Sequence, residues 1–135
     1  MRRTLDTNIC SYILRRHPAT MIERFASLDK DQVWLSCIVA AELRFGALKL
    51  ASPRFQSAIE TWLLGFDVRP WPIEATHHYA SIRAALERSG QPIGNMDLMI
   101  AAHALSEDSV VITNNAKEFL RVPNLAVEEW AINAE

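Results

Sequence analysis

Four acidic residues, each beside a short apolar run, are the side chains in this 135-residue sequence best suited to do chemistry. They are Asp6, Glu42, Asp97 and Glu118. Charged side chains rarely enter a protein core unless they pair with an opposite charge or bind a metal. If the fold gathers these carboxylates, their repulsion requires a cation, and hard divalent ions such as Mg²⁺ or Mn²⁺ take oxygen ligands of this kind. The leading hypothesis is therefore metal-assisted hydrolysis of a phosphodiester bond.

Asp6 and Glu42 also have ordinary structural explanations. Asp6 begins Asp-Thr-Asn at an expected strand-to-helix turn, where it could cap the helix, and it could do so while binding a metal. Glu42 lies in mid-helix, where a glutamate is usually solvated. Gly46, four residues on, costs about 1 kcal/mol relative to Ala in a helix interior. A small residue there would let a ligand or another backbone come close to Glu42.

Asp97 and Glu118 lie near expected helix starts. A carboxylate in the first turn is favoured by the helix dipole, which would explain Asp97 without any function. The next residues, 98–102, are almost wholly apolar, so we expect this helix to be buried with its N-terminus facing something polar. Glu118 stands three residues after Asn115, a spacing that approximates a capping box. Capping is therefore favoured over metal binding for Glu118, whether the metal is bound directly or through water.

Apolar periodicity divides the chain into alternating strands and helices. We expect strands over 2–5, 33–36, 68–71, 109–113 and near 125–127. We expect helices over 8–15, 18–28, 37–49, 53–65, 74–89 and 95–105, and a short helical turn over 115–120. Ser36 and Asn95 should cap the helices that follow them.

This alternation predicts an α/β fold for residues 1–135 as a single domain. We expect a central, mostly parallel sheet of about four or five short strands with helices on both faces. Ligands of such sheets bind beyond the carboxyl ends of the strands, at a topological switch point. Asp6 follows the first strand directly, and Thr113, Asn114 and Asn115 end the strongest later strand. Both segments should therefore lie at the site.

Composition narrows the function classes. The net charge of −2 and the pI of about 6.1 argue against a protein that holds nucleic acid by bulk electrostatics. They do not exclude a nuclease, because bound divalent ions would reverse the local field. No apolar run is long enough for a membrane span or a signal peptide, so we expect a cytoplasmic protein without membrane association. The sequence has no P-loop and no G-x-S-x-G motif, and its histidines form no ligand pattern.

Four stretches of the chain together resemble the PIN-domain nucleases. They are Leu5-Asp-Thr-Asn8, Ala41-Glu-Leu-x-x-Gly46, Pro92-x-x-x-x-Asp97 and Thr113-Asn-Asn-x-x-Glu-Phe119. Their order and spacing cover nearly the whole chain and make the resemblance fairly specific. The chain looks most like the VapC toxins of bacterial toxin–antitoxin pairs.

The resemblance implies an Mg²⁺ or Mn²⁺ site for endonucleolytic cleavage of RNA, with Asp6, Glu42 and Asp97 as its core acids. The family often has a fourth acid at the position that Asn115 occupies here. This departure implies a weaker second metal site, assisted by Glu118. Some members with a similar Thr-Asn-Asn stretch cut tRNA in the anticodon region, so tRNA is one candidate substrate.

The chemistry of such a site agrees with these residues. A metal ion can lower the pKa of a bound water to near neutrality and stabilise charge on the phosphate. Two ions, if both bind, would lie about 3.5–4 Å apart. No side-chain nucleophile is then needed. Thr7, Asn8 and Thr113 could orient the ligands or hold a water beside them.

The resemblance also implies a small antitoxin protein as partner, and a homodimer or a larger toxin–antitoxin assembly. Two expected helices carry more large apolar side chains than a small domain can easily hide: Tyr12, Ile13, Trp62 and Leu63. These side chains are either all core or partly the lining of a groove for an amphipathic partner helix. An arginine of that partner could reach the acids through charge-assisted hydrogen bonds.

Two other readings remain open from the sequence. The first is a metal-dependent phosphohydrolase acting on a small substrate, of the haloacid-dehalogenase type. Such an enzyme requires Asp-x-Asp after the first strand, and Asn8 replaces its second aspartate. The second is a non-catalytic interaction protein whose acids are helix caps and surface charges.

Overall fold

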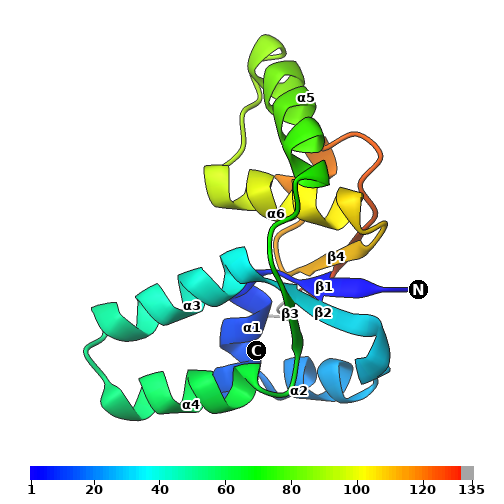
Figure 1. The fold of residues 1–135 in the computed structure, drawn as a ribbon. Helices are drawn as coiled ribbons and strands as arrows, with labels where there is room; N and C mark the ends of the chain where they lie inside the picture. The colour runs from blue at the N-terminus through cyan, green and yellow to red at the C-terminus, as the bar shows by residue number, and fades with distance from the viewer. Residues whose placement is uncertain (132–135) are drawn as a thin grey trace.

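Five short parallel strands form one sheet in the computed structural model, in the order β3-β2-β1-β4-β5 (Figure 1). The structure describes residues 1–131. The strands are β1 (Arg3–Leu5), β2 (Val33–Ser36), β3 (Asp67–Arg69), β4 (Val110–Thr113) and β5 (Val127–Glu129). The predicted α/β fold with a parallel sheet is confirmed.

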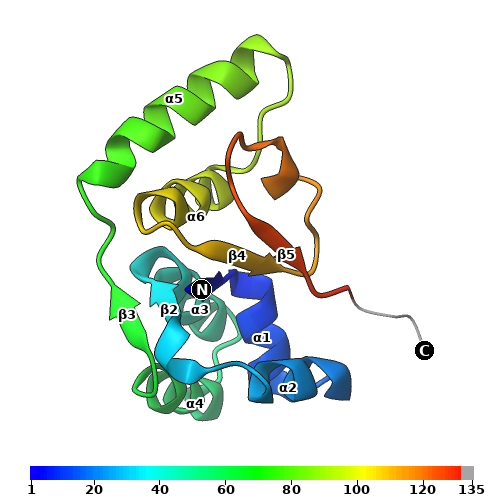
Figure 2. The same ribbon diagram turned by 90° about the vertical axis from the view of Figure 1, so that its right-hand side faces the viewer.

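Helices cover both faces of this sheet. They are α1 (Thr7–Arg15), α2 (Ala19–Ala26), α3 (Cys37–Lys49), α4 (Pro53–Leu63), α5 (Glu74–Arg88) and α6 (Asn95–Ser106), with short 3₁₀ turns η1 (Lys30–Gln32) and η2 (Phe119–Arg121). In Figure 2, α5 and α6 lie on one side of the sheet, and α1, α2 and α4 lie on the other. None of the helices within residues 1–131 combines the length and the apolar character that crossing a bilayer requires.

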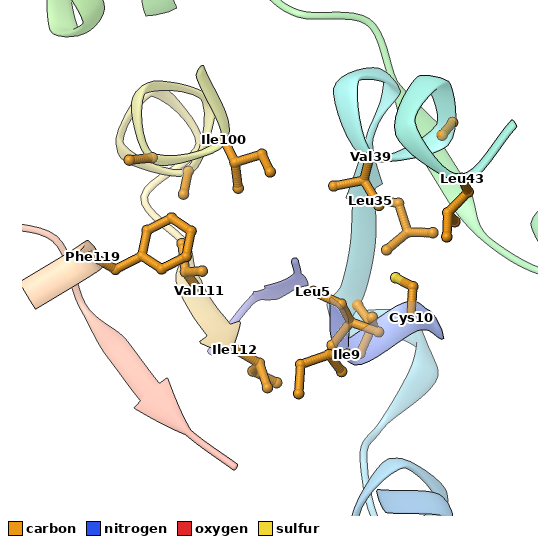
Figure 3. Close-up of a cluster of buried hydrophobic side chains, with 14 of the residues drawn as sticks. Leu5, Ile9, Cys10, Leu35, Val39, Leu43, Ile100, Val111, Ile112 and Phe119 are labelled. Atoms are coloured by element: carbon orange, nitrogen blue, oxygen red, sulfur yellow. The ribbon is translucent and has the colours of Figure 1, made fainter. Parts of the chain in front are cut away.

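The buried core lies on both sides of the sheet, as Figure 3 shows. Leu5 and Ile112 meet Ile9 of α1 on one face, while Val111 faces Phe119 and the α6 side on the other. Each fully buried side chain of this size stabilises the fold by about 2 kcal/mol. The central strands β1 and β4 are therefore fixed firmly, and so are the residues that follow them.

Local sequence signals explain where several helices begin. Ser36 caps α3, because its hydroxyl accepts a hydrogen bond from the backbone N–H of Ile38 at 3.1 Å. Ser52 caps α4 in the same way, through Phe55 N at 3.2 Å, and Pro53 occupies the first turn.

The predicted cap of α6 is wrong. Gly94 occupies the cap position without a side-chain hydrogen bond, and Asn95 is the first helical residue. The Asn95 side chain instead accepts a hydrogen bond from the Tyr79 hydroxyl at 2.6 Å. A tertiary partner thus replaced the local bond that the sequence predicted.

Other boundaries differ by a few residues. The strand predicted over 68–71 is Asp67–Arg69, because Pro70 and Pro72 have no N–H for the ladder. The strand predicted near 125–127 is Val127–Glu129, and the helix predicted over 18–28 ends at Ala26. The helical turn predicted over 115–120 is shorter and lies further along the chain, at Phe119–Arg121.

The order of the strands creates a switch point between β1 and β4. From β1 the chain moves outward to β2 and β3, and then returns to the opposite side of β1 to form β4. The backbone N–H of Asp6 donates to Ile112 O at 3.0 Å, which holds the ends of the two strands together. Asp6 and Thr113 therefore lie beside each other at the carboxyl edge, where ligands of such sheets bind.

Candidate metal centre

Asp6 is buried at the end of β1, and only 5% of its surface is exposed. It caps α1, since its Oδ1 accepts a hydrogen bond from Ile9 N at 2.9 Å. Burial raises the pKa of this carboxyl, and the negative charge of Glu42 raises it further, while hydrogen bonds from Thr113 and the backbone lower it. The predicted capping role of Asp6 is confirmed, and its metal binding stays a prediction.

Glu42 is joined to the start of α1. The Thr7 hydroxyl donates to Glu42 Oε1 at 2.6 Å, which links α1 to α3 and orients this carboxylate. A Cβ built at Gly46 would meet no atom within 4 Å, so the close approach of a ligand stays a prediction. No backbone within residues 1–131 therefore needs this glycine for close approach, and the space beside it is open.

Asp97 lies half-buried in the first turn of α6, next to Glu118. The pKa of Asp97 is raised to about 7, chiefly by burial. The hydrogen bond and negative charge of Glu118 raise it further, and the charges of Asp6 and Glu42 add to this effect. The hydrogen bond with Asp97 lowers the pKa of Glu118. Asp97 is therefore the member of this pair that keeps its proton to the higher pH. The rest of α6 is largely buried, as predicted from its apolar sequence.

The capping box predicted for Asn115 and Glu118 is absent from the structure. Glu118 Oε1 accepts a hydrogen bond from Gly94 N at 3.1 Å, across the edge of the sheet. Asn115 is exposed, and its Oδ1 accepts weakly from Lys117 N at 3.4 Å. Glu118 thus lies with the other acids, although its sequence position favoured a local role.

The remaining predicted residues surround these acids. Thr113 is buried and accepts from Asn115 N at 3.1 Å, whereas Asn8 is exposed. Sequence reasoning missed Glu129, whose Oε2 accepts from Ala116 N at 2.9 Å and so holds the loop after β4. The last strand was predicted near 125–127, so the sequence did not indicate that Glu129 lies at a strand end.

The electrostatics of this edge fit a divalent cation. Within residues 1–131, none of the four carboxylates forms a salt bridge with a basic side chain. The side chain of Asn114 adds a buried Oδ1 that has no hydrogen-bond partner within residues 1–131. The positive charge of Arg121 lowers the pKa of Glu118, whereas the charges that act on Asp97 are all negative. Oxygen donors in such a negative field suit Mg²⁺ or Mn²⁺.

The four acids lie at the same edge of the sheet, but they do not form a compact set of metal ligands. Across the described residues, no group of three acidic, histidine or cysteine side chains lies close enough to hold a metal ion. The fields of Asp6, Glu42 and Glu118 nevertheless all act on Asp97. Binding a cation would therefore require small movements of the side chains or of the helices that carry them.

Comparison with known proteins agrees with this geometry. A family model described as "PIN domain" matches residues 4–125. The tRNA(fMet)-specific endonuclease VapC of Shigella flexneri is 40% identical over 128 residues, which cover 94% of this chain and 96% of that protein. The crystal structure of VapBC2 from Rickettsia felis, bound to a DNA fragment from their promoter, matches with a TM-score of 0.87 and 38% identity over 96% of this chain and 99% of that one. DNA-bound VapBC from Salmonella typhimurium matches with a TM-score of 0.89 and 38% identity, over 97% and 99%.

The chain belongs to the PIN-domain family, and within it to the VapC ribonucleases. The resemblance inferred from the four sequence stretches is confirmed. Family membership favours the nuclease over both the haloacid-dehalogenase-type phosphohydrolase and the non-catalytic interaction protein.

Proposed function

We propose that this protein is a divalent-metal-dependent endoribonuclease and the toxin of a toxin–antitoxin pair. Its metal ligands would be Asp6, Glu42 and Asp97, and the metal Mg²⁺ or Mn²⁺. One observation carries the proposal: carboxylates from distant parts of the chain gather at the switch point without a basic partner. Glu118, and more weakly Asn115, would assist a second ion.

The protein's own groups would prepare this site. Ile9 N fixes the Asp6 carboxylate, and Thr7 fixes that of Glu42, so both present oxygens in set directions. A bound Mg²⁺ or Mn²⁺ ion would supply activation of a water and stabilisation of charge on the phosphate. Asp97, whose pKa is raised to about 7, must be ionised to act as a ligand, so cation binding near neutral pH would release a proton.

RNA is the proposed substrate, and tRNA is the first RNA to test. The relative from Shigella flexneri is named a tRNA(fMet)-specific endonuclease, and it aligns over nearly all of this chain. Because tRNA is cytoplasmic, the cytoplasm is the proposed place of action.

The proposed partner is a small antitoxin protein, in a homodimer or larger assembly. The structures from Rickettsia felis and Salmonella typhimurium are of VapBC bound to DNA. Here, a cavity of about 660 Å³ lies between α1, α2 and α4, with Ile22 and Trp62 among its apolar lining residues. Ile13 and Leu63 are core residues with 6% exposure, whereas Trp62 is only half-buried. Part of the predicted apolar set is thus available to a partner helix.

Basic residues adjoin that cavity and indicate what the partner carries. Arg16, Lys30 and Arg54 line it together with the apolar side chains. A helix with an apolar face and acidic flanks would complement this lining.

The activity is tested by sequencing the RNA fragments that the purified protein releases from total RNA and from tRNA with Mg²⁺. We expect discrete cuts that disappear with a chelator and in Asp6→Asn. Cleavage that persists in both would overturn the metal mechanism, and no cleavage of any RNA would overturn the nuclease.

The partner is tested by co-expression with the product of the adjacent small reading frame. Trp62→Ala should weaken the complex, whereas Leu64→Ala, an 86% exposed side chain outside the cavity, should not. If no complex forms and the chain alone does not slow growth, the toxin assignment fails while the nuclease assignment stands.

A further inference from the structure

A buried hydrogen bond joins the start of α3 to the last turn of α6. His103 Nδ1 lies 2.9 Å from Ser36 Oγ, and neither residue has any exposed surface. Ser36 ends β2 and caps α3, while His103 lies on the face of α6 that packs against the sheet. No other side-chain hydrogen bond of the described residues connects these two helices or their caps.

The hydrogen-bond pattern at Ser36 indicates the direction of this bond. Ser36 Oγ already accepts from Ile38 N at 3.1 Å, so its hydroxyl proton is free to donate to His103 Nδ1. Burial lowers the pKa of His103 to about 4, so the ring is neutral at physiological pH. The ring proton then lies on Nε2, which is buried without a partner within residues 1–131.

A side chain with one orphaned nitrogen is a poor choice for stability alone. A buried polar atom without a partner destabilises the fold, and an apolar residue of similar size would avoid that penalty. The imidazole does pack on Trp34, with the ring centroids 4.5 Å apart, but a leucine could also fill that space. What the imidazole adds is a directed bond of fixed length between two helices.

Both helices carry proposed metal ligands at similar distances from this bond. Glu42 lies six residues after Ser36, and Asp97 lies six residues before His103. At 1.5 Å per residue, each acid is about 9 Å along its helix, so a 10° change of tilt would move it by about 1.5 Å. Mg²⁺ requires near-ideal octahedral geometry with short bonds, and a shift of that size would weaken its binding.

We propose that His103, acting through Ser36, is a positioning residue for the metal site. The bond would set the angle between α3 and α6 and thereby the separation of Glu42 and Asp97. The inference rests on the proposed function, because it assumes that these acids bind a divalent cation. It assigns a role to a residue that the sequence pattern had set aside, since His103 does not share the helix face of Asp97.

Two substitutions at His103 separate positioning from packing. His103→Leu keeps the bulk of the side chain and removes both nitrogens, whereas His103→Asn places an amide oxygen near Nδ1, where it can accept from Ser36. We expect His103→Leu to weaken Mn²⁺ binding about tenfold, as for other residues that orient metal ligands. Its melting temperature without metal should stay close to that of the wild type, because removing the orphaned Nε2 offsets the loss of an acceptor for the Ser36 hydroxyl. His103→Asn should lose stability because it leaves a cavity, yet retain most of the Mn²⁺ affinity.

Titration of each purified variant with Mn²⁺, together with thermal unfolding without metal, distinguishes a positioning role of His103 from a packing role. Equal Mn²⁺ affinity in wild type and His103→Leu would overturn the inference, as would equal losses in the Leu and Asn variants. A wild-type protein that binds no Mn²⁺ would overturn the proposed function instead.

A second pair covers the case in which His103→Leu does not fold. Ser36→Ala and Ser52→Ala each remove the hydroxyl that caps a helix, but only Ser36 bonds to α6. We expect Ser36→Ala alone to lower Mn²⁺ affinity. Equal Mn²⁺ affinity in these two variants would contradict a positioning role for the bond.

Discussion

Two regions of this molecule differ in whether their acidic residues form salt bridges with basic residues. In the arginine cluster of Arg2, Asp67, Arg69 and Glu107, every acid has a basic partner: Glu107 pairs with Arg2 at 3.3 Å and with Arg69, and Asp67 pairs with Arg69 at 2.8 Å. At the carboxyl edge, Asp97 has Glu118 as its hydrogen-bond partner, and Glu42 has only a hydroxyl. One region neutralises its charge internally, whereas the acids of the other act mainly on one another.

This difference separates structural charge from functional charge. Paired surface ions add little to stability and rarely perturb a pKa strongly. Gathered carboxylates raise one another's pKa values and destabilise the metal-free protein, so an arrangement of this kind indicates a site. Matched substitutions in the two regions, Asp97→Asn and Asp67→Asn, test whether their acids differ in this way.

The largest expected effect is on RNA cleavage. Asp97→Asn should lower kcat/KM by about 100-fold or more, because it removes a ligand of the charge-stabilising ion. The matched Asp67→Asn should cleave at the wild-type rate. Rates on one defined RNA with Mg²⁺ measure both, and full activity in Asp97→Asn would show that this acid is not part of the site.

Next in size is the stabilisation by metal. Mn²⁺ at about 100 times its Kd should stabilise the wild type by about 2.7 kcal/mol. For a chain of this size that free energy raises the melting temperature by about 10 °C. Differential scanning fluorimetry should find this shift in wild type and Asp67→Asn but little in Asp97→Asn. An equal shift in all three proteins would place the ion elsewhere.

A smaller effect concerns pH in the metal-free protein. The pKa of Asp97 rises from 3.8 to about 7 on folding, so between these values the native state binds more protons than the unfolded state. The contribution of Asp97 to stability is therefore fully present below about pH 4 and is lost as the pH rises towards 7. His103, with its lowered pKa, acts in the opposite direction but equally in wild type and Asp97→Asn.

The stability difference between these two proteins should therefore change in favour of Asp97→Asn as the pH rises from 4 to 7. Denaturant unfolding at several pH values, in a chelator, measures it. A difference that does not vary with pH would mean that Asp97 has an ordinary pKa and that the acids do not interact.

The smallest expected effect is on the arginine cluster itself. The Asp67 side chain is 59% exposed in its bond to Arg69, so Asp67→Asn should change the free energy of unfolding by no more than about 0.5 kcal/mol. Urea unfolding with a chelator would detect a larger loss, which would mean that charge pairing in this cluster is a major source of stability.

Most of the fold could be predicted from local patterns. The apolar run before Asp6 and the Val-Val-Ile run of β4 identified two central strands, and Ser36 and Ser52–Pro53 mark helix starts that the structure contains. The errors had two causes, a tertiary partner in one case and neighbouring prolines in the other. Asn95 bonds to Tyr79 rather than capping α6, and prolines shorten β3.

The candidate site was predictable in part, for a physical reason. Asp6 could be placed because strand order and burial fix the end of β1, and its capping role is visible in the sequence. Glu118 was assigned to a capping box because its bond to Gly94 spans 24 residues and leaves no local pattern. The bond between His103 and Ser36 spans 67 residues and could not be predicted for the same reason.

The most direct test of the central claim is a crystal structure of the protein with Mn²⁺, located by its anomalous scattering. The account predicts an anomalous peak bonded to carboxylate oxygens of Asp6, Glu42 and Asp97, with Glu118 near it. The peak should be absent from crystals of Asp97→Asn grown in the same way. Crystals of the wild type without a peak there, at Mn²⁺ concentrations that support RNA cleavage in solution, would contradict it.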